Sequence, residues 1–193
     1  MKIGIMGGTF DPVHNGHLML GHAAYEAFSL DQIWFMPNGN PPHKKSETIK
    51  STAEDRMKMT SLAIAPFPEF VLQPYEALRA EVSCSYQTME HFSKIYPDDE
   101  FYFIIGADSL MAIETWVHPE RIFPTCTILA TYRNEVKTKE EMNRQIQYLS
   151  ENIMQRYVCW RRLLCLSHLM NCVPVFSPGI PSRNICRLLY AVI

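Results

Sequence analysis

The chain has 193 residues, of which 47% are hydrophobic and 20% are charged, and its net charge is −2 at pH 7. These values are typical of one globular α/β domain with a substantial core, and they exclude a disordered or fibrous chain. The weak negative charge argues against binding to nucleic acid or to an anionic membrane through bulk positive charge.

The apolar runs and the cysteines indicate where the protein functions. No basic segment followed by a long apolar run opens the sequence, and no stretch of about 18 uninterrupted apolar residues follows. The six cysteines form no Cys-x-x-Cys pair. We therefore expect a cytoplasmic protein with reduced thiols, no zinc site, no membrane span and no nucleic-acid partner.

Strand-like and helix-like segments alternate along the chain. Apolar runs predict strands at 2–6, 32–36, 70–72, 101–105 and 126–131, and the spacing of apolar residues predicts helices at 15–28, 51–64, 85–95 and 137–152. The second helix is expected to begin with a capping box formed by Ser51 and Glu54. This alternation predicts a Rossmann-like, doubly wound parallel sheet with helices on both faces.

Two loops are candidates for ligand binding, because ligands bind at the carboxyl ends of the strands in such sheets. Gly7-Gly8 follows the first strand, and we expect these residues to make a tight turn that brings the backbone close to a ligand. Gly106-Ala107-Asp108 follows the strand at 101–105. Both loops are therefore predicted at the same edge of the sheet.

Two histidines flank the start of the first predicted helix. His14 and His17 are three residues apart, so both can face one phosphate-sized anion at the positive end of the helix dipole. The alternative is that one histidine lies on the surface and the other caps the helix. Metal binding is less favoured, because no third Cys, His or carboxylate has a matching spacing.

The run Gly7-Gly8-Thr9-Phe10-Asp11-Pro12-Val13-His14-Asn15-Gly16-His17 resembles the signature of the His-x-x-His nucleotidyltransferase superfamily, and most closely that of bacterial nicotinate-nucleotide adenylyltransferases. The resemblance covers about residues 1–150 and extends to Pro41-Pro42-His43-Lys44, Glu76 with Arg79, Ser85-Tyr86 and Ile105-Gly106-Ala107-Asp108-Ser109. Trp116 resembles in position the aromatic residue that this family places near the pyridine ring.

The resemblance implies transfer of AMP from ATP to nicotinate mononucleotide, giving deamido-NAD and pyrophosphate in NAD biosynthesis. Its implied cofactor is Mg²⁺, held mainly by ATP oxygens and water. It implies His14 and His17 as catalytic donors to the phosphates. The implied ATP-binding residues are Gly7, Gly8, Thr9, Phe10, His14, His17, Gly106 and Asp108. The implied residues for the pyridine mononucleotide are Thr9, Lys44, Ser85, Tyr86 and Trp116, and no side chain is assigned to a metal.

Several of these residues have a simpler interpretation. Lys44 can be a solvated loop lysine, Asp108 can cap a helix at 109–114, and Trp116 can pack in the core. Gln87 stands where the family usually has a threonine, so the choice between nicotinate and nicotinamide stays open. The sequence gives no indication of the oligomeric state.

The composition changes after about Ser150. Acidic residues end at Glu151, and four of the six cysteines follow residue 158. In this part of the chain the family has a serine-containing turn followed by a helix that begins with an arginine. Only Ser177 or Ser182-Arg183 faintly resemble that turn here. We therefore predict a nucleotidyltransferase domain at 1–150 and an atypical tail at 151–193.

Two origins for this tail remain open. One is a shift of the reading frame near residue 153, and the other is a C-terminus that is divergent but folded. A foreign tail would deprive the ATP site of its arginine and leave a nucleotide-binding protein with impaired catalysis. A third alternative is an adenylyltransferase that uses another phosphate acceptor.

Overall fold

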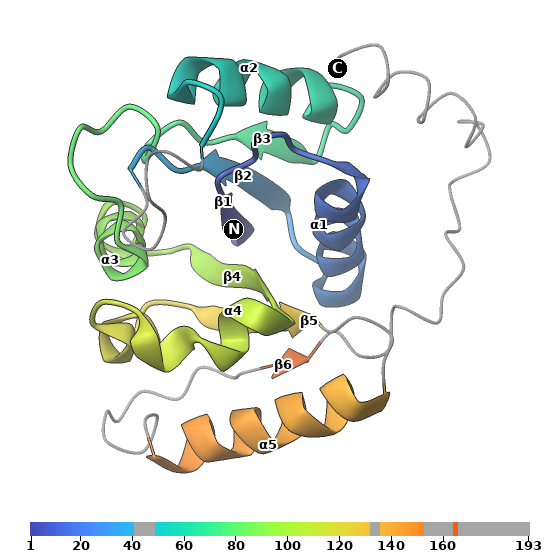
Figure 1. Cartoon of the computed structure of the whole chain (residues 1–193), viewed down its shortest axis with the longest axis vertical. Helices are drawn as coiled ribbons and strands as arrows, with labels where there is room; N and C mark the ends of the chain where they lie inside the picture. The colour runs from blue at the N-terminus through green and yellow to red at the C-terminus, as the bar shows by residue number, and fades with distance from the viewer. Residues whose placement is uncertain (41–48, 132–135, 153–163, 166–193) are drawn as a thin grey trace.

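The computed structural model describes residues 1–40, 49–131, 136–152 and 164–165 (Figure 1). In chain order the elements are β1 (Lys2–Gly8), α1 (Asn15–Phe28), β2 (Gln32–Pro37), α2 (Ala53–Ile64), β3 (Phe70–Leu72), α3 (Ser85–Ile95), β4 (Glu100–Gly106), α4 (Ala107–Met111), β5 (Thr127–Thr131), α5 (Val136–Asn152) and β6 (Leu164–Cys165). Two short 3₁₀ turns, η2 (Ile113–Thr115) and η3 (Pro119–Arg121), lie between α4 and β5. The predicted strands and helices are confirmed, and their bounds differ from the prediction by two residues at most.

The strands of the described chain form one parallel sheet in the order β3-β2-β1-β4-β5-β6. The chain moves outward from β1 to β3 and then returns to place β4 on the other side of β1. This doubly wound topology confirms the predicted fold class. The strand order reverses between β1 and β4, which is where such sheets bind their ligands.

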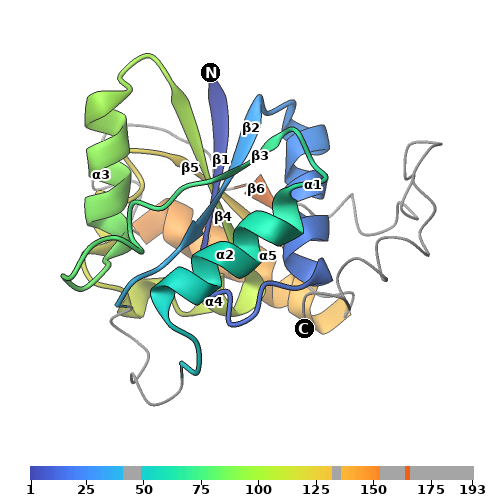
Figure 2. The same ribbon diagram turned by 90° about the horizontal axis from the view of Figure 1, so that it is seen from above.

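The core lies on both faces of the sheet. Alternate strand residues point to opposite faces. Ile5 and Phe103 therefore belong to a buried cluster that α3, α4 and α5 cover, whereas Phe35 and Ile104 belong to a second cluster under α1 and α2. Figures 1 and 2 show α1 and α3 on opposite sides of the sheet. Burial of these two clusters contributes most of the favourable free energy of folding, and it thereby fixes the strand ends that carry the candidate site.

The start of α2 differs from the prediction. Thr52, not Ser51, is the N-cap, and its hydroxyl oxygen accepts a hydrogen bond from the Asp55 amide at 3.1 Å. The amide of Ser51 instead donates to the carboxylate of Asp11 at 3.4 Å. The expected capping box of Ser51 and Glu54 was therefore wrong, because a contact with a distant residue keeps Ser51 outside the helix.

The predicted tight turn at Gly7-Gly8 was also wrong. Both glycines are the last residues of β1 and lie opposite Met36 and Pro37 of β2. Between β1 and α1 the left-handed conformation falls on Phe10, with φ 49°, and no glycine in the described part of the chain has a positive φ. A Cβ on Gly8 would lie 2.9 Å from the Phe10 ring. Gly8 therefore makes room for an aromatic ring, and the chain turns two residues later.

Beyond residue 152 the structure describes only β6. This strand pairs in parallel with β5, in a part of the chain for which the sequence predicted no strand. The rest of the predicted tail, including Ser177, Ser182 and Arg183, lies outside the described residues. Within the described residues, no helix has both the length and the apolar character that a membrane span requires.

Candidate active site

The segment between β1 and α1 brings the two predicted histidines together. His14 is the N-cap of α1, with φ −143° and ψ 169°, and His17 lies in the first turn of the helix. Their rings stack with centroids 3.7 Å apart and an interplanar angle of 25°. The predicted proximity is therefore confirmed, although His14 also takes the capping position that the simpler interpretation gave to one histidine.

A backbone hydrogen bond fixes the tautomer of His17. The amide N–H of His14 donates to Nδ1 of His17 at 3.2 Å, so Nδ1 carries no proton and a neutral ring must carry its proton on Nε2. Burial of the ring, together with the charge of His14, lowers the pKa of His17 from 6.5 to about 4. Near neutral pH, His17 is therefore an uncharged hydrogen-bond donor through Nε2.

The lowered pKa of His17 predicts how stability depends on pH. As pH falls, the unfolded chain takes up this proton near pH 6.5 and the folded chain only near pH 4. The stabilising contribution of His17 is therefore fully present above pH 6.5 and is lost between pH 6.5 and pH 4. We expect the melting temperature to fall less over this interval in His17→Gln than in the wild type. The control, Met19→Gln at an exposed position of the same helix, should keep the wild-type fall, and equal falls in the wild type and His17→Gln would contradict the assignment.

Thr9 and Phe10 connect β1 to the histidines. The carbonyl oxygen of Thr9 accepts a hydrogen bond from the guanidinium of Arg56 in α2 at 2.7 Å. The ring of Phe10 is buried and meets the His17 ring edge-on at a centroid distance of 5.0 Å. Sequence reasoning missed Arg56, although it lies four residues before Thr60 on the buried side of α2. An arginine within an inward-facing stripe was the available signal.

The second predicted loop begins at the carboxyl end of β4. Gly106 is the N-cap of α4, and a Cβ placed there would meet no atom within 4 Å, so the surface beside it is open. Asp108 is the second residue of α4 and is exposed. The alternative that Asp108 is the helix cap was therefore wrong, because the helix begins before it. Its carboxylate remains free to meet a ligand at this edge.

The start of α3 lies beside the end of β2. The amide of Ser83 donates to the Asn40 carbonyl oxygen at 2.9 Å, and Val82 forms a parallel bridge with Asn40. Ser85 is the first residue of α3, two positions after this contact. The structure therefore places Ser85 at the same edge of the sheet as the loop that follows β2.

Two buried polar side chains hold the segment before α3. The hydroxyl of Thr88 donates to the carboxyl group of Glu76 at 2.6 Å, and burial raises the pKa of Glu76. Glu76 is only 6% exposed and Thr88 only 1%. This contact fastens residues 73–84 to the first turn of α3.

Trp116 lies on the α3 side of the sheet. Its ring packs against the core and meets the edge of Phe103 at a centroid distance of 6.1 Å. The Phe103 ring in turn lies 3.7 Å from the position of a Cβ on Gly7. One aromatic ring therefore separates Trp116 from the end of β1, and the core packing that the sequence allowed for Trp116 is present.

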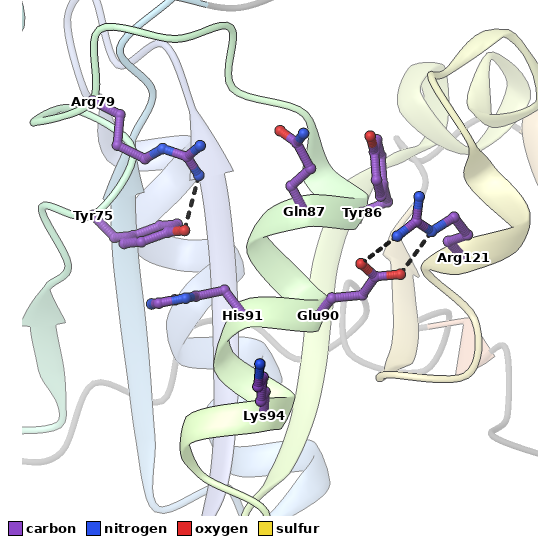
Figure 3. Close-up of a pocket in the computed structure, with 8 residues that line it drawn as sticks. All are labelled: Tyr75, Arg79, Tyr86, Gln87, Glu90, His91, Lys94 and Arg121. Atoms are coloured by element: carbon purple, nitrogen blue, oxygen red, sulfur yellow. Dashed lines mark hydrogen bonds and ion pairs between the residues drawn. The ribbon is translucent and has the colours of Figure 1, made fainter.

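Tyr86 packs against the same core cluster as Trp116 but also reaches the surface. It lines an open surface hollow of about 420 Å³ beside α3, together with Arg121 (Figure 3). The guanidinium of Arg121 lies 4.4 Å from the centroid of the Tyr86 ring and makes two hydrogen bonds of 2.7 Å to the carboxylate of Glu90. The role of Tyr86 in binding a pyridine ring stays a prediction. Lys44 lies outside the described residues.

Comparisons with known proteins show the family of the chain. Residues 5–160 match the family described as cytidylyltransferase-like. The chain is 42% identical over 132 residues to the "Probable nicotinate-nucleotide adenylyltransferase" of Geobacillus thermodenitrificans, a match that covers 68% of this chain and 61% of that one. It is also 42% identical over 148 residues to the protein of the same name from Carboxydothermus hydrogenoformans, where the shares are 77% and 72%.

A solved structure shows the same fold. The nicotinic acid mononucleotide adenylyltransferase of Plasmodium falciparum, complexed with NaAD, matches with a TM-score of 0.64 and 21% identity, over 75% of this chain and 70% of that one. The chain spans 61% to 65% of the length of the first four curated relatives. The family match begins within β1, at residue 5, and includes both histidines and the end of β4. The resemblance noted from the sequence is thus confirmed, and the chain belongs to the cytidylyltransferase-like family.

Proposed function

We propose that this protein is a nicotinate-nucleotide adenylyltransferase, which transfers AMP from ATP to nicotinate mononucleotide and releases pyrophosphate. The observation that carries the proposal is the stacked pair of His14 and His17 at the start of α1, with His17 held as a neutral donor. Two relatives named "Probable nicotinate-nucleotide adenylyltransferase" are 42% identical to this chain over the aligned residues, which supports the choice of reaction.

The proposed reaction forms one phosphorus–oxygen bond and breaks another. A phosphate oxygen of nicotinate mononucleotide attacks the α-phosphorus of ATP, and the bond from that phosphorus to the oxygen that bridges to the β-phosphorus breaks. Pyrophosphate leaves with the electron pair. Such a transfer depends on alignment of the two phosphates and on donors placed where negative charge develops.

The described residues supply such donors. No described residue accepts a hydrogen bond from Nε2–H of His17, so this group can donate to a phosphate oxygen, and the ring of His14 stacks on the ring of His17. The N-terminus of α1 adds a favourable dipole at the same point. Because His17 is uncharged near neutral pH, it donates a hydrogen bond throughout the reaction without transferring a proton.

We propose that Mg²⁺ enters as part of the ATP substrate. Among the described residues, no group of three or more His, Cys, Asp or Glu side chains could hold a metal ion. The donors at the start of α1 are imidazole and backbone N–H groups, which suit phosphate oxygens rather than a cation. Coordination by phosphate oxygens and water, as Mg²⁺ usually prefers, is compatible with this donor set.

The pyridine mononucleotide is proposed to lie on the α3 side of the sheet edge. Ser85 begins α3 there, and Trp116 lies one ring away from the end of β1. His14 and His17 belong to the α1 side, so the two nucleotides would meet across the ends of β1 and β4. Thr9, Lys44 and Tyr86 remain proposed contacts, as do Gly106 and Asp108 for ATP.

The deciding experiment incubates the protein with ATP, Mg²⁺ and either nicotinate or nicotinamide mononucleotide, and follows pyrophosphate release. We expect release with nicotinate mononucleotide and slower release with the amide. Binding of ATP in a calorimeter without release from either acceptor would instead support a catalytically impaired nucleotide-binding protein. Release with the amide alone would overturn the proposed acceptor but retain the reaction type.

A further inference from the structure

Arg56 is a charged residue inside the fold. It lies in the first turn of α2 and is only 1% exposed. Thr60, Ala63 and Ile64 are buried on the same side of this helix, at intervals of four, seven and eight residues. A guanidinium in such a stripe loses its hydration, and it is tolerated only where its N–H groups find acceptors.

The acceptors of Arg56 come from two different strand ends. Nη1 donates to the Thr9 carbonyl oxygen at 2.7 Å and to Oδ1 of Asn38 at 3.4 Å, and Nη2 donates to the Gly39 carbonyl oxygen at 3.4 Å. Thr9 follows β1, and Asn38 and Gly39 follow β2. Nε is buried and has no partner among the described residues. One side chain therefore joins the segment that leads to the histidines to the segment after β2, which contacts Val82 and Ser83 just before α3.

A second contact joins the β1–α1 segment to the start of α2, and here the β1–α1 segment supplies the acceptor side chain. The carboxylate of Asp11 accepts hydrogen bonds from the amides of Lys50, at 2.7 Å, and Ser51, at 3.4 Å, just before α2. Hydrogen bonds from Ser51 and Lys50 lower the pKa of Asp11, which keeps it charged. Burial lowers the pKa of Arg56, and the charge of Asp11 opposes that shift. The β1–α1 segment is thus held at residue 9 and at residue 11.

The position of His17 depends on this segment. Phe10 lies between the two anchored residues in the left-handed conformation, which residues with a side chain rarely adopt. Its ring meets the His17 ring at 5.0 Å. A change in the Thr9 peptide would therefore move Phe10 and, with it, the ring that carries the Nε2–H donor.

We propose that Arg56 is a positioning residue for phosphate transfer, which holds the Thr9 peptide so that His17 and the segment after β2 keep a fixed relative placement. This inference rests on the proposed function. A purely stabilising role for the charge is a poor explanation, because apolar residues of similar volume often replace buried charges without loss of stability. The fork of a guanidinium, in contrast, can bind acceptors on two segments at once.

The test compares Arg56→Lys and Arg56→Met with Arg144→Met, which removes an exposed arginine of α5. Lysine keeps the charge but lacks the fork, so we expect kcat of Arg56→Lys to fall by about 10²-fold with a melting temperature close to that of the wild type. Arg144→Met should keep the wild-type kcat. If Arg56→Met does not fold, the lysine variant carries the test alone.

A second measurement does not depend on activity. The ¹⁵N chemical shifts of the His17 ring report which nitrogen is protonated, and we expect the wild type to show a single Nε2–H tautomer. In Arg56→Lys the shifts should move toward a mixture, because the His14 amide is no longer held against Nδ1. If the wild type releases no pyrophosphate, the proposed function fails, but these shifts still test Arg56. Wild-type kcat, or wild-type shifts in a folded Arg56→Lys variant, would overturn the positioning role.

Discussion

Alanine in place of His17 is expected to lower kcat by about 10²–10³-fold, because the variant loses a donor aimed at the charge that develops on the phosphates. Nδ1 of His17 accepts a hydrogen bond from the His14 amide, and Nε2–H has no acceptor in the part of the chain that the structure describes, so this histidine offers one donor to a ligand. Initial rates of pyrophosphate release at saturating ATP and nicotinate mononucleotide measure the effect. His22→Ala, on the same helix but in contact with Glu69, is the matched control and should retain the wild-type rate.

Two further variants test which nitrogen of His17 acts. A glutamine places its amide nitrogen near the position of Nε2, whereas an asparagine places it near Nδ1. We therefore expect His17→Gln to retain more activity than His17→Asn. The reverse order would show that the tautomer fixed by the His14 amide is not the active one, and an unimpaired His17→Ala would remove the proposed mechanism.

Replacing Gly39 by alanine is expected to destabilise the fold by about 3 kcal/mol, at the upper end of what overpacking usually costs. A Cβ at this position would lie 2.5 Å from the Glu76 carbonyl oxygen and 3.0 Å from the Arg79 carbonyl oxygen. Both are backbone atoms, so rotation of a side chain cannot relieve the clash. The segment after β2 and the segment before α3 would have to separate.

Denaturant unfolding of Gly39→Ala and the wild type measures this change. The control is Gly106→Ala, because a Cβ on Gly106 meets no atom within 4 Å and should leave the unfolding midpoint nearly unchanged. An equal midpoint for Gly39→Ala and the wild type would show that these two segments do not pack as the structure describes. A lowered unfolding midpoint in Gly106→Ala would show that the space beside Gly106 at the end of β4 is smaller than the structure describes.

Most of the fold is predictable from the sequence because its strands and helices carry strong local patterns. The strand at 101–105 is an apolar run between Glu100 and Gly106, and the structure extends it by one residue at each end. The first helix was placed with its observed bounds, Asn15–Phe28. In contrast, the two residues of β6 form no pattern of their own, and their assignment as a strand depends on pairing with β5.

The parts of the site that escaped prediction depend on distant residues. Arg56 has its acceptors 47, 18 and 17 residues away, so its place in the apolar stripe of α2 indicates burial but does not show which groups it binds. The shift of the α2 cap has the same kind of cause, since Asp11 occupies the amide of Ser51. The turn was misplaced because Phe10, and not a glycine, takes the left-handed conformation there.

The hydrogen bond from the His14 amide to the His17 ring has a consequence for the direction of the reaction. In the proposed function His17 holds the same proton before and after transfer, so the site needs no proton return between turnovers. The same arrangement would then serve the attack of pyrophosphate on the dinucleotide. Net flux would follow the supply and removal of pyrophosphate, and a pyrophosphatase in the same compartment would make synthesis effectively one-way.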